Sequence, residues 1–149
     1  MTILEEAFEK ENYIEISFSF NGAGHPTIPF TINDEQVTFL LDTGAASNIL
    51  DLEFCKTRGF PLTSTGQKGG GAGGLTLDTY STGAITFFYK TIKFSHEFYA
   101  MEFDTIRQAL EAHGVQDEIQ GILGFDFLKP NSSFIDYAKN RIFVKPINS

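Results

Sequence analysis

Cysteine is almost absent from the sequence, since Cys55 is the only one in 149 residues. A lone thiol cannot form an intramolecular disulfide, so it places no constraint on the redox compartment. Histidine is also scarce, and His25, His96 and His113 lie too far apart to show the spacing of a zinc site. We therefore expect a fold that depends on its hydrophobic core, with no metal and no other cofactor.

Positive charge and long apolar stretches are lacking as well. The 11 Lys and Arg form no basic run and are outnumbered by 19 Asp and Glu, which gives a net charge of −8. Such a surface repels nucleic acid and anionic membranes, so neither is expected as a partner. The N-terminus, MTILEEAFEKENY, resembles neither a signal peptide nor a membrane anchor. A cytoplasmic location is expected if Met1 is the natural start.

Phenylalanine, by contrast, is abundant. The 16 Phe lie mainly in alternating or clustered runs, which favours a mostly β protein with an aromatic core. The length suits one domain, and no repeat or linker divides the chain. Within it we distinguish an N-terminal arm with the first strand over residues 1–22 from the main body over residues 23–149.

Hydrophobic periodicity predicts most of the secondary structure. Short helices are expected over 51–58, where Asp51 can serve as N-cap, and over 104–113, with a helical turn at 125–128. Two hairpins are expected, one of which turns at residues 33–35. The expected strands cover residues 13–20, 27–32, 36–41, 75–80, 84–88, 92–101, 119–123, 134–137 and 141–144.

One candidate for chemistry is Asp42-Thr43-Gly44, directly after the apolar strand expected over 36–41. An acidic residue in this place, followed by a small hydroxyl residue and glycine, can present a carboxylate in a tight loop. A plain Asx turn after a strand explains the same three residues. The motif alone leaves both interpretations open.

A second candidate lies near the C-terminus, where GILGFDFL over residues 121–128 is followed by IDY over 135–137. Alone, it indicates a buried strand, a glycine turn and a helix. Together with LLDTGA, and in this order, it resembles the retropepsin-like aspartic peptidases, including their bacterial and eukaryotic cellular relatives. The resemblance covers about residues 26–144. It implies the single-domain acid protease fold of that family, mostly β with a glycine-rich flap and two or three short helices.

The resemblance also implies roles for individual residues of the first motif. Asp42 is expected to be the catalytic residue. The family's pattern makes Thr43 bond across a dimer axis, while Gly44 and Ala45 complete the loop.

The second motif is expected to support the first. In the resembling family the element that matches Ile122-Leu123-Gly124 packs beside the catalytic loop and leads into a short helix. Asp126 and Asp136 are then structural residues of a cap or a turn.

A glycine-rich segment lies between the two motifs. In the resembling family a hairpin flap occupies this place and closes over the substrate, a role that suits a backbone with few side chains. The expected flap residues are Gly69, Gly70, Gly71, Ala72, Gly73 and Gly74. A surface loop remains a second interpretation. A nucleotide-binding loop is disfavoured, because a strand pattern follows the glycines instead of a helix.

The chemistry of an aspartic peptidase needs two carboxylates that share a proton, and the chain contains only one such loop. We therefore expect a homodimer in which Asp42 and its copy meet on the two-fold axis, and an extended peptide or protein substrate. The alternative is a catalytically inert dimer of the same fold that binds a peptide without cutting it. Cys55 lies on an apolar helix face, where an inert buried thiol is expected.

Overall fold

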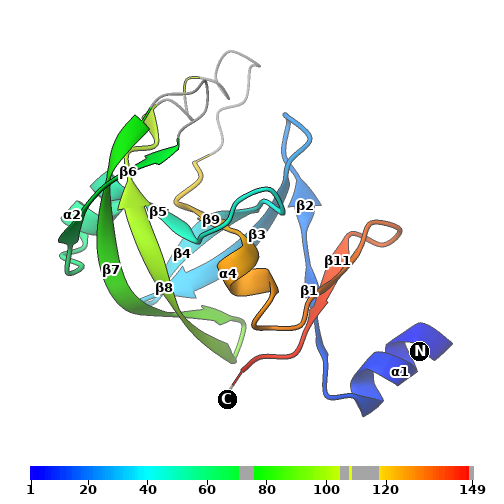
Figure 1. Cartoon of the computed structure of the whole chain (residues 1–149). Coiled ribbons are helices and arrows are strands. Elements are labelled where there is room, and N and C mark those ends of the chain that lie inside the picture. Colours follow the sequence, from blue (N-terminus) through cyan, green and yellow to red (C-terminus); the bar gives the residue numbers. More distant parts are fainter. Residues whose placement is uncertain (71–75, 105–107, 109–117, 148–149) are drawn as a thin grey trace.

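The computed structural model describes residues 1–70, 76–104, 108 and 118–147, and the fold is mostly β, as expected (Figure 1). The strands are β1 (Ile14–Ser17), β2 (Ser19–Phe20), β3 (Pro26–Ile32), β4 (Glu35–Leu41), β5 (Ile49–Asp51), β6 (Thr63–Gly70), β7 (Thr76–Tyr89), β8 (Ile92–Met101), β9 (Gly121–Leu123), β10 (Phe134–Asp136) and β11 (Arg141–Val144). The described helices are α1 (Ile3–Lys10), α2 (Leu52–Thr57) and α4 (Phe125–Leu128).

The described strands form a large and a small sheet. The large sheet has eight strands in the order β2-β3-β4-β9-β5-β8-β7-β6, and a further pairing of Thr31 with Phe88 closes it on itself. The small sheet, β1-β11-β10, lies to the right of it in Figure 1. The helix expected over 104–113 lies outside the described residues, apart from Asp104 and Gln108. No helix in the described part of the chain is long and apolar enough to span a membrane.

Two elements show the turn and cap chemistry expected from the sequence. The β3–β4 hairpin turns at Asn33 and Asp34, whose φ angles of +49° and +63° are left-handed values that these residues tolerate. α2 begins after Asp51, whose side chain accepts a hydrogen bond from Glu53 N (3.4 Å). Gly59, with φ of +70°, follows its C-terminal end.

β1 and β2 replace the single strand expected over residues 13–20. β1 pairs with β11 and β2 pairs with β3, so the chain passes from one sheet to the other at Phe18. The Phe18 ring is buried, and its backbone N donates to Asn140 O (3.0 Å). The expectation of one strand was wrong, because alternation shows which side chains are buried but not which strand becomes the partner.

β7 is one continuous strand where the sequence predicts two. A bulge lies between Ser81 and Ala84, and it interrupts the alternation on which the sequence-based prediction rests. At the bulge the buried hydroxyl of Thr82 accepts a hydrogen bond from Phe98 N (3.3 Å). This side chain keeps the two strands joined through the irregular point.

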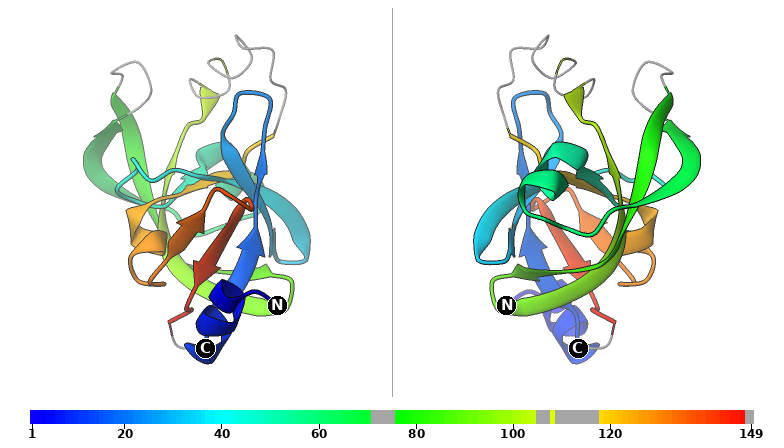
Figure 2. Two further views of the ribbon diagram at one scale, coloured as in Figure 1. Left: turned by 90° about the vertical axis from the view of Figure 1, so that its right-hand side faces the viewer. Right: turned by 90° about the vertical axis from the view of Figure 1, so that its left-hand side faces the viewer.

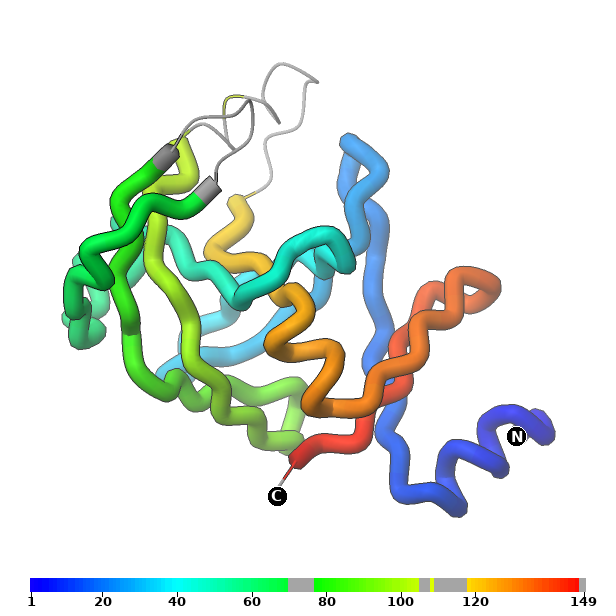
Figure 3. Tube along the Cα trace, viewed as in Figure 1, coloured from blue at the N-terminus to red at the C-terminus, as the bar shows by residue number. Residues whose placement is uncertain are grey.

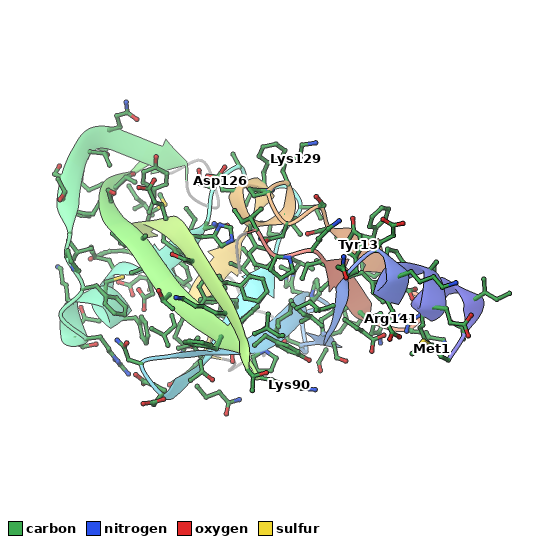
Figure 4. The ribbon with its side chains drawn as sticks, turned by 90° about the horizontal axis from the view of Figure 1, so that it is seen from below. Met1, Tyr13, Lys90, Asp126, Lys129 and Arg141 are labelled. Atoms are coloured by element: carbon green, nitrogen blue, oxygen red, sulfur yellow. The ribbon has the colours of Figure 1, made fainter. Side chains whose placement is uncertain are left out.

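α1 is absent from the sequence-based expectations. It begins with a capping box, in which Glu5 N donates to Thr2 Oγ1 (3.2 Å) and Thr2 N donates to Glu5 Oε2 (3.3 Å). The ring of Phe8 stacks on Phe143 of the small sheet at 4.0 Å between centroids. Glu5 also pairs with Arg141 (2.9 Å), which lies close to α1 in Figure 4. α1 therefore lies against the small sheet, at the end of the molecule opposite to where β6 ends and β7 begins (Figure 2).

Aromatic side chains fill the inside of the curled large sheet. Phe87 is fully buried and contacts five other phenylalanine rings at centroid distances of 5.1 to 6.2 Å. Those rings belong to Phe30, Phe39, Phe94, Phe98 and Phe127. A second, smaller cluster contains Leu40, Phe103, Ile119 and Ile122. β4 contributes to both clusters, so apolar side chains pack against both of its faces where it leads into the first motif.

Candidate active site

Asp42 stands at the end of β4, a strand that is buried on both faces. Leu41 packs into the main aromatic core, while Leu40 packs into the smaller cluster. β4 pairs in parallel with β9, and Asp42 N continues that ladder by donating to Leu123 O (3.0 Å). The Asp42 residue is half-buried. Its backbone is thus fixed by a rigid strand, while its side chain emerges at the edge of the core.

The loop after Asp42 turns back on the carboxylate. Gly44 N donates to Asp42 Oδ1 (2.9 Å), and Ala45 N donates to Asp42 O (3.1 Å). A Cβ on Gly44 would lie only 3.2 Å from Oδ1, so the turn favours glycine here. Among the described residues, Asp42 Oδ2 has no hydrogen-bond partner. The motif is therefore an Asx turn that leaves one carboxylate oxygen unengaged, so the two interpretations of the motif are compatible.

The element Ile122-Leu123-Gly124 lies directly beside this loop. A Cβ on Gly124 would lie 2.4 Å from Ala45 O and 2.8 Å from Ser47 O, so only glycine permits this approach. Phe125 N donates to Ala45 O (2.8 Å) and anchors the start of α4 to the same loop. The structure thus brings together the two sequence motifs, which are far apart along the chain.

Asn48 is a residue of this site that the sequence-based expectations omit. It is 1% exposed, and its Oδ1 accepts a hydrogen bond from Gly124 N (3.1 Å). The available sequence signal is an amide side chain directly before the apolar pair Ile49-Leu50, at a place where a buried strand begins. A polar residue there can equally be solvent-exposed, so the signal is weak without the structure.

The segment expected as a flap is described only in part. Gly69 and Gly70 end β6, and residues 71–74 lie outside the described residues. Gly69 pairs with Leu77 of β7. Among the described residues, β6 before the glycines pairs with β7 after them, whereas a nucleotide-binding loop is followed by a helix. In Figure 3, β6 and β7 stand at the left, and the loop after β4 crosses the centre of the molecule.

Cys55 and Asp136 do not form a competing catalytic site. Cys55 is fully buried, and its burial, with a smaller contribution from the Asp51 carboxylate, raises the pKa of the thiol to about 12. Asp136 accepts a hydrogen bond from Ala138 N (2.9 Å) and forms an ion pair with Arg141 (2.8 Å). Both groups are thus accounted for by the fold.

The surroundings of Asp42 open toward the surface of the chain, since Thr43 and Gly44 are exposed. No group of three or more His, Cys, Asp or Glu in the described part of the chain is placed to hold a metal ion. An open hollow of about 560 Å³ does not include Asp42 among its lining residues. It is lined by Phe20, Asn21, Gly22, Thr27, Thr38 and Glu118.

Comparison of the sequence with known families gives one match. A family model described as aspartyl protease matches residues 28–127, a span that contains both Asp42 and Gly124. A search of curated proteins finds no match to this chain.

Comparison with solved structures gives several similar folds. A retropepsin-like aspartic protease from Rickettsia conorii matches with a TM-score of 0.58 and 20% identity, over 89% of this chain and 98% of that one. The retroviral protease-like domain of Ddi1 from Leishmania major matches with a TM-score of 0.56 and 20% identity, over 82% and 89%. EIAV protease in complex with the inhibitor HBY-793 matches with a TM-score of 0.50 and 26% identity, over 70% and 86%. These similarities confirm the expected single-domain, mostly β retropepsin-like fold.

Proposed function

The chain belongs to the aspartyl protease family, and we propose that it is an aspartic endopeptidase that is active as a homodimer. The geometry of the Asp42 loop carries the proposal. Its carboxylate stands at the end of a strand buried on both faces, with Oδ1 held by Gly44 N and Oδ2 unengaged by any described residue. No ion pair among the described residues involves Asp42. The fold thus orients this carboxylate, and no cation of the described residues pairs with it.

In the proposed mechanism, Asp42 of one subunit faces Asp42 of the other, and the two carboxylates share one proton. The ionised carboxylate takes a proton from a water molecule, and the protonated one donates a hydrogen bond to the oxygen of the scissile carbonyl. The water oxygen then attacks the carbonyl carbon directly and gives a tetrahedral intermediate. The intermediate collapses as the C–N bond breaks, and the carboxyl group that took the proton from water donates it to the leaving amine nitrogen. No covalent bond forms between the substrate and the protein.

The homodimer follows from the number of carboxylates that one chain contributes. A C2 interface brings the same loop of two subunits to one axis, which supplies the second Asp42. The exposure of Thr43 and Gly44 supports this arrangement, because these residues remain available for contact with a second copy. Thr43 is the residue we assign to the bond across the axis.

The proposed substrate is an extended peptide or protein segment bound between the two Asp42 loops and a flap. The described part of the β6–β7 hairpin, paired as far as Gly70 and Thr76, supports this assignment. Main-chain hydrogen bonds of the β type would give affinity, and apolar side chains would be preferred around the cleaved bond. The flap residues in this proposal are Gly69, Gly70, Gly71, Ala72, Gly73 and Gly74.

The test is cleavage of a diverse peptide pool between about pH 3 and about pH 8, with wild type and Asp42→Asn compared. Asparagine keeps an oxygen that can accept from Gly44 N but cannot act as the base. We expect cuts between apolar residues that fall by about 10²-fold or more in the variant.

Two other results would change the assignment. A folded, dimeric wild type that binds peptides but cuts none would be the inert binding module. Cuts that persist at the wild-type rate in Asp42→Asn, after exclusion of contaminating peptidases, would place the catalytic group elsewhere.

A further inference from the structure

Three consecutive residues, Leu123–Phe125, hold the loop between β4 and β5. Leu123 is the last residue of β9, and the other two follow it. Leu123 O accepts from Asp42 N (3.0 Å), and Phe125 N donates to Ala45 O (2.8 Å). Between them, Gly124 N donates to the side chain of Asn48 (3.1 Å). The first two bonds join backbone to backbone, whereas the third depends on one side chain. The bond between Gly124 N and Asn48 is therefore the one of the three that substitution of a side chain can remove.

Asn48 also joins this loop to β8. Its backbone O accepts from Tyr99 N (2.9 Å), and its Nδ2 lies 3.5 Å from Glu97 O. The residue is 1% exposed, so each of its polar atoms needs a protein partner. Its amide group thus connects the end of the Asp42 loop to β8 and to Gly124 at the same time.

The close approach of Gly124 makes the position of Asn48 sensitive. Gly124 has no side chain to hold it away from the loop, and a Cβ there would meet Ala45 O at 2.4 Å. The separation is therefore set by hydrogen bonds, of which the Asn48 bond is one. Loss of that bond would leave Gly124 N buried without a described partner and remove the side-chain link between Gly124 and the end of the loop opposite to Asp42.

We propose that Asn48 is a positioning residue for catalysis, which fixes the Asp42 loop through Gly124 and β8. This inference rests on the proposed peptidase function. Asn48 does not touch the substrate; it determines where the loop places the Asp42 carboxylate relative to the copy in the second subunit. Because both subunits contain the same loop, a displacement occurs twice in each dimer. The effect is on the chemical step and not on peptide binding.

The experiment compares Asn48→Ala and Asn48→Ser with a matched control, Asn131→Ala. Asn131 is also fully buried, and its Nδ2 donates to Phe127 O (2.7 Å), outside the segment Leu123–Phe125 that bonds to the Asp42 loop. For Asn48→Ala we expect kcat to fall about tenfold or more, with KM changed by about twofold or less. Asn48→Ser, whose hydroxyl can accept a hydrogen bond, recovers part of the loss. The pH dependence of kcat also moves in Asn48→Ala, since the spacing of the two carboxylates changes.

Asn131→Ala separates positioning from stability. It is expected to lower the melting temperature, yet to keep kcat and its pH dependence when measured well below that temperature. Equal loss of kcat in Asn131→Ala and Asn48→Ala would overturn the proposal, as would wild-type kcat in a folded Asn48→Ala dimer.

A second readout does not need activity. Amide hydrogen exchange at Asp42 and Gly124 is expected to speed up in Asn48→Ala and to stay unchanged in Asn131→Ala. If wild type cuts nothing, the peptidase function fails while this measurement still tests the role of Asn48 in holding the loop. Unchanged exchange at both amides in Asn48→Ala would contradict the proposal whether or not the chain cuts peptides.

Discussion

The aromatic core and the Asp42 loop are built on opposite principles. In the core, Phe87 alone touches five other phenylalanine rings, so each contact is one of many. In the loop, Asp42, Ala45 and Asn48 are each held by one hydrogen bond to the segment Leu123–Phe125. Stability is therefore distributed over many side chains, whereas the geometry of the candidate active site depends on a few bonds. Substitutions in the two regions should separate stability from activity.

The largest loss of stability is expected for Phe87→Ala. Truncation of a fully buried ring surrounded by five others leaves a cavity, at a cost of about 3–5 kcal/mol in the free energy of unfolding. Activity per folded molecule should be retained. Chemical denaturation measures the loss, and Phe134→Ala is the control, since this ring is 53% exposed and its removal should cost about 1 kcal/mol or less. Equal losses in the two variants would contradict the picture of the core.

Gly124→Ala, in contrast to Phe87→Ala, should reduce activity strongly and stability less. The new Cβ would lie 2.4 Å from Ala45 O, so the loop must shift, and we expect a loss of about 1–3 kcal/mol in stability and of about 10²-fold in kcat. The control is Gly59→Ala, where a Cβ meets nothing within 4 Å but φ is +70°. It should cost about 1–2 kcal/mol through backbone strain and leave kcat unchanged. Full activity in a folded Gly124→Ala would show that the loop tolerates displacement.

Arg141 extends the comparison to the small sheet, where ion pairs add to the aromatic packing of Phe8 on Phe143. Its side chain is 7% exposed and pairs with Asp136, Glu5 and Glu15. The hydrogen bonds to Arg141 lower the pKa of Asp136 and of Glu5 below their ordinary values of 3.8 and 4.5. Their contribution to stability is therefore present above those values and is lost as the pH falls through the lowered ones.

Arg141→Gln should consequently reduce stability at neutral pH and flatten its decline in acid. Denaturation curves between about pH 2 and about pH 7 measure both effects. An unchanged slope below about pH 4 would mean that these ion pairs do not contribute to acid sensitivity.

Substitution of His96, which lies inside the aromatic core, should give the smallest change in stability. It is 8% exposed, lies among the rings of Phe87 and Phe127, and its Nε2 is 3.0 Å from Asn131 Nδ2. Burial lowers the pKa of His96 below 6.5, an effect that the nearby carboxylate of Asp126 opposes. The unfolded chain therefore takes up a proton that the folded protein does not, so stability falls as the pH drops below about 6.5.

His96→Gln removes this titration while keeping an oxygen that can accept from Asn131 Nδ2. The free energy of unfolding should then depend less on pH between about 7 and about 5. A variant with the wild-type pH dependence in this range would assign the effect to other groups.

The sequence could predict the parts of the site that depend on local pattern. β4 and the motif Asp42-Thr43-Gly44 were predictable because an apolar strand ends in a turn motif, and α2 because Asp51 and Gly59 mark its ends. The mostly β class followed from the runs of phenylalanine. These features are set by residues that are neighbours in the chain.

The parts that the sequence did not reveal depend on distant partners. α1 has a capping box, but a helix of this length needs tertiary packing, here of Phe8 on Phe143. The role of Asn48 depends on Gly124, which lies far along the chain and becomes its neighbour only when β5 and β9 pair. Local periodicity carries no information about either contact.

The most direct test of the two-subunit active site is a subunit-mixing experiment. Wild type is held at a constant concentration while Asp42→Asn is added in increasing excess, with native mass spectrometry used to confirm that mixed dimers form. If each site needs Asp42 from both subunits, activity falls toward zero as mixed dimers replace wild-type pairs. Addition of the same mass of an inert protein should have no effect. Activity that stays constant while mixed dimers accumulate would show that one Asp42 suffices and would contradict the account.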